Sequence, residues 1–134
     1  MVDDAGQLSQ NAVFATARIF PGELRPEVVL FQPADGQTIT TNRINATGEA
    51  FDDTALARVE VRIQNVETSE FLNSDGSFGS SEWIPAQQTN PGADRTNWDY
   101  SSPLLPDGNY VFQARSVDAN DQTSPAARAE LVLN

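Results

Sequence analysis

Three oxygen-bearing side chains, Asp118, Asn120 and Asp121, lie close together in the stretch 116–125 (SVDANDQTSP). Carboxylates and side-chain amides at this spacing are ligands that calcium prefers. Paired carboxylates can also do acid–base chemistry, and the same residue types cap turns. The stretch is therefore open to three hypotheses: a calcium site, a catalytic carboxylate cluster and an acidic turn.

The composition argues against catalysis. The chain of 134 residues contains no cysteine and no histidine, which removes thiolate chemistry, the commonest general base and every Ser-His or Cys-His arrangement. A glycosidase-like carboxylate pair needs a cleft between the two groups, and no nucleophile elbow or phosphate loop is present. We predict that the protein is not an enzyme.

The charge limits the class of partner. The net charge is -11 and all eight basic residues are arginine, so the surface repels phosphate backbones and anionic lipid. No apolar run approaches the roughly 18 residues of a membrane span. We expect neither nucleic-acid binding nor membrane insertion, and the charge serves either cation binding or solubility alone.

The elements that must position these side chains are strands. Apolar and polar residues alternate with period two in 57–65 (ARVEVRIQN), 109–117 and 128–133, which is typical of half-buried antiparallel strands. Weaker strands are expected at 27–32, 43–49, 68–72, 82–87 and 96–101. Asp-Gly pairs and prolines separate the runs, as turn residues do. Seven to eight short strands at this spacing predict an all-β, immunoglobulin-like antiparallel β-sandwich over 27–134.

Residues 1–26 stand apart as an extension or linker. Within them, 12–20 (AVFATARIF) alternates like a strand and ends at Pro21-Gly22. This strand either belongs to a linker or a preceding module, or it pairs with an edge of this domain or of a neighbouring copy.

Four stretches occur in the order of a known module: FQPADGQTI (31–39), the Val-rich run 46–72, SDGSFGSSEWI (74–84) and 97–121. On these, the chain resembles the bacterial immunoglobulin-like and fibronectin type III-like modules of large extracellular proteins. The resemblance implies a spacer, adhesion or accessory module at a cell or virion surface. It implies neighbouring domains or copies of itself as partners.

The stretch LPDGNY (105–110) resembles the tyrosine corner of such modules. The likeness implies that Leu105 plugs the core and that the Tyr110 hydroxyl bonds the backbone a few residues upstream. The chain lacks the paired cysteines and the central-strand tryptophan of antibody-type domains, and Trp98 lies on a later strand. That departure favours the bacterial and fibronectin-like branch.

The sandwich topology brings two acidic loops together. The loop after the second strand and the loop before the last strand emerge at the same end, so their oxygen ligands would lie near one another. The candidate Ca²⁺ ligands are Glu49, Asp52, Asp53, Asp118, Asn120 and Asp121. A calcium ion bound there would stiffen this end of the domain; the alternative is turn capping without an ion.

Aromatic residues suggest a second kind of site. Phe78 and Trp83 lie in or beside a Gly- and Ser-rich stretch and are candidate contacts for a glycan, whereas Trp98 and Tyr100 share a strand face and are expected to be buried. The sequence therefore predicts a non-enzymatic structural, spacer or adhesion module. Two alternatives stay open: a carbohydrate-binding accessory domain, and a subunit that assembles by donating residues 12–20.

Overall fold

The protein is described by a computed structural model over residues 26–53 and 55–134. This described part contains strands and no helix, so it holds no helix that could cross a membrane. The strands are β1 (Glu27–Gln32), β2 (Gln37–Ile39), β3 (Asn45–Phe51), β4 (Leu56–Asn65), β5 (Phe71–Leu72), β6 (Phe78–Gly79), β7 (Ile84–Pro85), β8 (Gln87–Gln88), β9 (Arg95–Ser101), β10 (Gly108–Asp118) and β11 (Ala127–Leu133).

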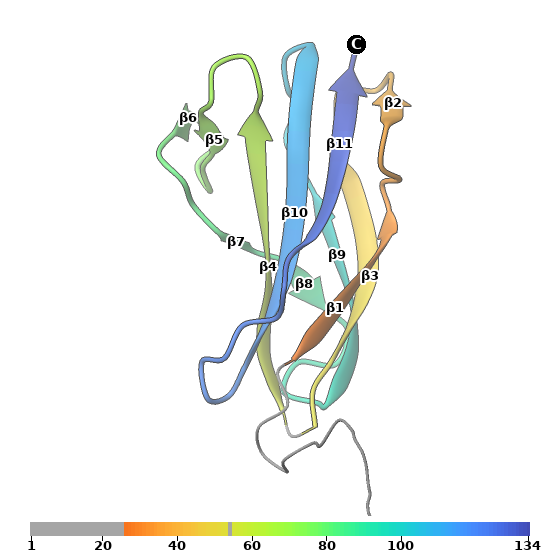
Figure 1. Ribbon diagram of the computed structural model, residues 1–134, viewed down its shortest axis with the longest axis vertical. Coiled ribbons are helices and arrows are strands. Elements are labelled where there is room, and N and C mark those ends of the chain that lie inside the picture. Colours follow the sequence, from red (N-terminus) through yellow and green to blue (C-terminus); the bar gives the residue numbers. More distant parts are fainter. Residues whose placement is uncertain (1–25, 54) are drawn as a thin grey trace, which may run out of the picture.

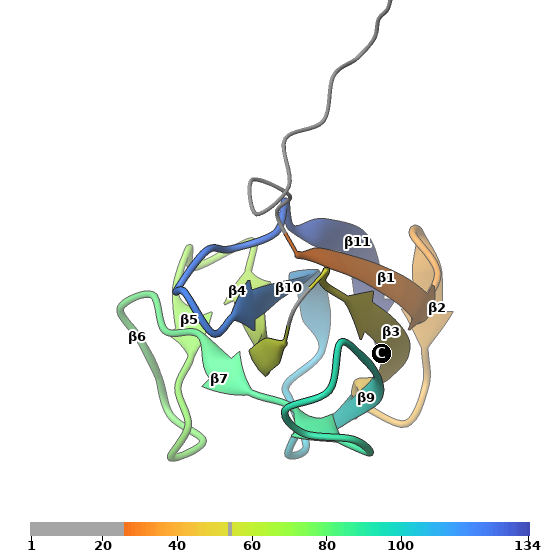
Figure 2. The ribbon, with the colours of Figure 1, turned by 90° about the horizontal axis from the view of Figure 1, so that it is seen from below.

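Two sheets pack face to face (Figures 1 and 2). The smaller sheet has the order β1-β3-β9-β8, and the larger has the order β2-β11-β10-β4-β5-β6, with β7 paired to β4. The prediction of an all-β immunoglobulin-like sandwich is confirmed. Pairing is antiparallel except between β2 and β11, which run parallel. The exception arises because the chain leaves the smaller sheet after β1 and continues in the same direction as β2, beside β11 (Figure 1).

The core forms between the inward faces of the long strands. Val59, Val61 and Ile63 of β4 are fully buried, as the alternation of 57–65 predicts. They share the core with Trp98 of β9, which is 2% exposed, and Tyr100, two residues further along β9, is half-buried against the same core. The period-two alternation therefore gives each of these strands one face buried in the core and one face toward solvent.

Trp98 needs a glycine opposite it. Gly48 of β3 pairs with Trp98 across the smaller sheet, and a Cβ at position 48 would lie 2.7 Å from the indole and would clash with the Val29 carbonyl oxygen. The indole nitrogen of Trp98 donates to the Glu49 carbonyl oxygen at 3.2 Å. The ring is thus held flat against the backbone of its neighbouring strand.

The two ends of the described part lie at opposite ends of the sandwich (Figure 1). Pro26 precedes β1 at the end that also carries the β3–β4, β8–β9 and β10–β11 loops, which we call the N-terminal pole. Asn134 follows β11 at the other end, the C-terminal pole, where its backbone nitrogen donates to the Ile39 carbonyl oxygen at 3.1 Å.

The strand expected at 82–87 is wrong as a single element. The structure has two short strands there, β7 in the larger sheet and β8 in the smaller. The chain changes sheets around Ala86, whose nitrogen donates to the Val59 carbonyl oxygen at 2.8 Å. β2 was not expected from the sequence. The strand proposed for 12–20 lies outside the described residues and stays a prediction.

Candidate functional site

Backbone hydrogen bonds tie the three loops of the N-terminal pole together. The nitrogen of Leu56 donates to the Ala93 carbonyl oxygen at 3.0 Å, and the nitrogen of Ala119 donates to the Ala55 carbonyl oxygen at 3.0 Å. The loop after β3 and the loop before β11 therefore do lie side by side, so the two groups of acidic residues share one end of the sandwich.

Asp118 holds its own loop in shape. Its side chain is buried, and its Oδ1 accepts hydrogen bonds from the backbone nitrogens of Asn120 (2.9 Å) and Gln122 (2.8 Å). This is the bonding of an Asx turn, in which the carboxylate replaces a backbone acceptor. Asn120 and Asp121 at the tip of the turn are exposed, and Asp121 has a φ of 62°, a conformation that Asp tolerates better than most residues.

Two other acids of the candidate set face arginines. Oε1 of Glu49 lies 3.7 Å from Nη1 of Arg95, and Oδ1 of Asp121 lies 3.9 Å from Nη1 of Arg58. Both distances are at the long end of an ion pair, and the Asp121 side chain is 87% exposed. Such pairs contribute little to stability, but each puts a guanidinium beside a carboxylate that a cation would need as a ligand.

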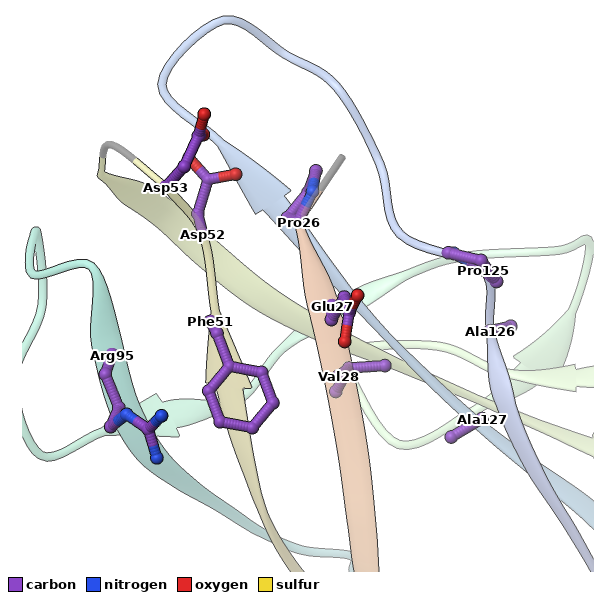
Figure 3. Close-up of a pocket in the computed structure, with 10 residues that line it drawn as sticks. All are labelled: Pro26, Glu27, Val28, Phe51, Asp52, Asp53, Arg95, Pro125, Ala126 and Ala127. Atoms are coloured by element: carbon purple, nitrogen blue, oxygen red, sulfur yellow. The ribbon is translucent and has the colours of Figure 1, made fainter. Parts of the chain in front are cut away.

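Asp52 and Asp53 line a groove of about 660 Å³ at the same pole. Pro26, Arg95 and the segment Pro125–Ala127 contribute to its walls, and Figure 3 shows the two aspartates beside the end of β10. The guanidinium of Arg95 lies over the ring of Phe51, 4.5 Å from its centre.

The described residues contain no group of three or more acidic side chains placed to hold a metal ion. The six candidate ligands divide into the Asp118 turn, the Glu49–Arg95 pair and the two groove aspartates. Asp118 already satisfies two backbone donors. This geometry favours the acidic-turn hypothesis for SVDANDQTSP, and the calcium site stays an untested alternative.

The LPDGNY stretch ties the β9–β10 connection to the core. Tyr110 is fully buried and its hydroxyl donates to the Pro106 carbonyl oxygen at 2.8 Å, while Leu105 is 4% exposed. The nitrogen of Leu105 donates to the Asn42 carbonyl oxygen, and the Asn42 side chain returns a bond to the Leu105 carbonyl oxygen at 2.9 Å. Burial raises the pKa of Tyr110, so the phenol stays a donor.

Trp83 lies on the outer face of the larger sheet, among arginines. The guanidinium carbons of Arg62 and Arg115 lie 4.5 Å and 4.1 Å from the centre of its ring, and Arg62 also lies 5.2 Å from the ring centre of Phe71. Arginine over an aromatic face is an attractive electrostatic contact. We call the set Phe71, Arg62, Trp83, Arg115, Glu60 and Arg58 the arginine–aromatic ladder.

Glu60 anchors the other end of the ladder. It is 8% exposed and accepts hydrogen bonds from Arg58 and Arg115, each at a shortest N–O distance of 2.8 Å. Burial raises the pKa of Glu60, but the bonds and charges of the two arginines outweigh burial and hold it below its ordinary value. The bond and charge of Glu60 in turn raise the pKa of Arg58.

Phe78, the other aromatic candidate for ligand contact, packs inward. Its ring centre lies 6.4 Å from that of Tyr110, and the side chain is half-buried against the core. Phe78 and Trp83 are therefore in different surroundings, and the structure does not bring them together as one platform.

The alternation of 57–65 puts Arg58, Glu60 and Arg62 on one strand face, but it does not reveal the ladder. The missing information was the register: Arg115 lies opposite Glu60, and Gln113 lies opposite Arg62. Alternation shows which residues share a face, but only strand pairing shows which residues meet across two strands.

Comparison with known proteins gives a family and a fold. A family profile described as a bacterial Ig domain matches residues 26–114. None of the curated protein sequences compared with this chain matches it.

One solved structure with a TM-score above 0.5 supports the same fold at low identity. A part of Astrotactin-2, a vertebrate-specific and perforin-like membrane protein, is 15% identical with a TM-score of 0.53; the match covers 82% of this chain and 22% of that one. The fibronectin(III)-like modules of Clostridium thermocellum CbhA are 17% identical with a TM-score of 0.49, over 80% of this chain and 96% of that one.

Proposed function

Because the chain belongs to the bacterial immunoglobulin domain family, we propose that it is a structural or adhesion module of a larger bacterial surface protein, without catalytic activity of its own. The family and the fold establish an immunoglobulin-like sandwich domain. A location outside the cell and neighbouring domains in the same protein are parts of the proposal.

The observation that carries the proposal is that β1 begins at one pole and the chain ends, after β11, at the other (Figure 1). The polypeptide enters at one end and leaves at the other, so domains attached on both sides would follow one another in line. Two long strands, β4 with 10 residues and β10 with 11, run between the poles. At about 3.3 Å per residue, each spans roughly 30 Å or more.

The pairing of the terminal strands suits a module that bears load along this line. β1 pairs with β3 in the smaller sheet, and β2 pairs with β11 in the larger. A pull on Pro26 and Asn134 would shear these pairs along the strands. Shear loads several ladder hydrogen bonds together, whereas peeling loads them one pair at a time.

Small-angle X-ray scattering of two joined copies tests the in-line arrangement. Residue 134 of the first copy is followed directly by residue 26 of the second, and a single copy is the control. We expect the maximum dimension of the pair to approach twice that of the single copy. A pair folded back to the maximum dimension of one copy would contradict the proposal.

A further inference from the structure

Positive charge gathers at one place on this acidic protein. Three of the eight arginines, Arg58, Arg62 and Arg115, lie on the outer face of β4 and β10. Glu60 pairs with Arg58 and Arg115, and Asp121 adds a long contact to Arg58. No carboxylate of the described residues lies within ion-pair distance of Arg62, so this end of the ladder keeps an unbalanced positive charge.

Neutral groups hold the Arg62 guanidinium in place. Its Nε and Nη2 donate to the side-chain oxygen of Gln113 at 3.1 Å and 2.8 Å, and its Nη1 donates to the hydroxyl of Ser81 at 3.0 Å. The rings of Phe71 and Trp83 flank it. Burial, and secondly the charge of Arg115, lower the pKa of Arg62. The guanidinium is thus fixed in orientation and partly desolvated without a countercharge.

The two guanidinium groups keep N–H donors that an anion could accept from. The Nη1 of Arg62 has a second proton beyond its bond to Ser81, and the Nη1 of Arg115 makes no hydrogen bond within residues 26–53 and 55–134. A carboxylate accepts such guanidinium donors through charge-assisted bonds, which are shorter and stronger than neutral ones. It would also supply the countercharge that Arg62 lacks.

The groups around the two arginines favour a sugar as the carrier of that carboxylate. A tryptophan edge, a side-chain amide and a serine hydroxyl are the apolar and polar groups that fix small polar ligands. We propose that Arg62, Arg115, Trp83 and Gln113 form a binding site for a carboxylate-bearing sugar, such as a uronic acid residue of a surface polysaccharide. This site goes beyond the load-bearing role and can fail without affecting it.

Nuclear magnetic resonance on the full chain tests the site. Methyl glucuronide is titrated against the indole N–H signal of Trp83 and the Nε–H signals of Arg62 and Arg115, at fixed ionic strength. Methyl glucoside, which lacks the carboxylate, and acetate, which lacks the sugar, are the matched probes. We expect saturable shifts with the glucuronide, with an affinity in the millimolar range, and much smaller shifts with either probe.

Three results would overturn the proposal: no shift at tens of millimolar glucuronide, equal shifts with the glucoside, or equal shifts with acetate or with a glutamate-containing peptide. The comparison of ligands needs no variant, so it decides the proposal even where a substitution unfolds the chain.

A matched pair of variants tests whether Arg62 itself contacts the glucuronide. Arg62→Gln should weaken binding of the glucuronide about tenfold, the effect of one lost charged contact. Arg128→Gln, which removes an exposed arginine of the same sheet paired with Glu130, should leave it unchanged. Equal weakening in both folded variants would show only a general effect of charge and would contradict the site.

Discussion

Glu60 and Arg115 face each other across β4 and β10, with Nη2 of Arg115 2.8 Å from Oε1 of Glu60. Arg58 bonds the second oxygen of the same carboxylate. One buried acid therefore holds two arginines, and Arg115 in turn reaches Trp83. The β5–β7 segment is linked to the central strands through this chain of contacts.

Glu60→Gln should lower the free energy of unfolding by about 1–3 kcal/mol, the cost of hydrogen bonds to charged groups. The amide keeps the shape of the side chain, but it leaves Arg115 without a countercharge and Arg58 with only its long contact to Asp121. Urea unfolding measures the change. Glu130→Gln is the control, because its pair with Arg128 is exposed and should contribute less than about 1 kcal/mol. Equal effects in both variants would remove the special role of Glu60.

The contribution of Glu60 should depend on pH. Its pKa in the folded protein lies below the ordinary value of 4.5, so the folded state favours the ionised form. The stabilisation is therefore complete above the unfolded pKa and disappears as the pH falls through the folded pKa. The difference in melting temperature between the wild type and Glu60→Gln should be largest near neutral pH and shrink below about pH 4. A difference that grows on acidification would contradict this assignment.

Tyr110→Phe should cost about 1 kcal/mol or somewhat more, because the variant leaves the Pro106 carbonyl oxygen without its phenol donor. Tyr100→Phe is the matched control, since the Tyr100 hydroxyl makes no hydrogen bond within the described part of the chain. Equilibrium unfolding should separate the two variants. A larger loss for Tyr100→Phe would contradict the role given to the β9–β10 corner.

Gly48→Ala should destabilise the fold by about 2–4 kcal/mol, as overpacking in a core does. The added methyl group would meet the Trp98 ring and the backbone of β1, and neither is free to withdraw. Gly79→Ala is the control, because its Cβ would meet only the side-chain oxygen of Asn73, at 3.2 Å. Thermal melting that ranks the two variants in the opposite order would be inconsistent with this packing.

Calcium should not raise the melting temperature specifically. Asp118 already accepts two backbone hydrogen bonds, so its turn is complete without an ion. Melts in chelator, in millimolar calcium and in millimolar magnesium, at fixed ionic strength, measure the effect, because a ligand of the folded state alone must stabilise it. A rise with calcium alone that vanishes in Asp118→Asn with Asp121→Asn would restore the calcium site.

The long strands could be predicted from the sequence because each carries enough alternating positions to show its face. The range 27–32 coincides with β1, and 57–65 and 109–117 fall on β4 and β10. Two-residue pieces such as β7 and β8 carry too few positions to show a period, and the change of sheet between them depends on a bond from Ala86 to β4.

For the candidate sites too, one part could be predicted from the sequence and another part could not. The sequence indicated that the loops of Asp52 and Asp118 would meet, because loop order follows from topology. It could not show that the Asp118 carboxylate would accept a hydrogen bond from the backbone of its own loop, or that Arg58 would lie near Asp121. It also named Trp83 with Phe78 as candidate ligand contacts without the arginines that cover Trp83, since those arginines come from other strands.

Single-molecule force spectroscopy tests the load-bearing account most directly. The chain has no cysteine, so handles can be attached at Pro26→Cys with Asn134→Cys, or at Asp75→Cys with Asn134→Cys. The first pair shears β1 against β3 and β2 against β11, whereas the second peels the short β5–β6 hairpin from β4. We predict an unfolding force at least about twice as high for the first pair, since several ladder bonds must break together. Equal forces, or a lower force between the poles, would contradict a module built to carry load from Pro26 to Asn134.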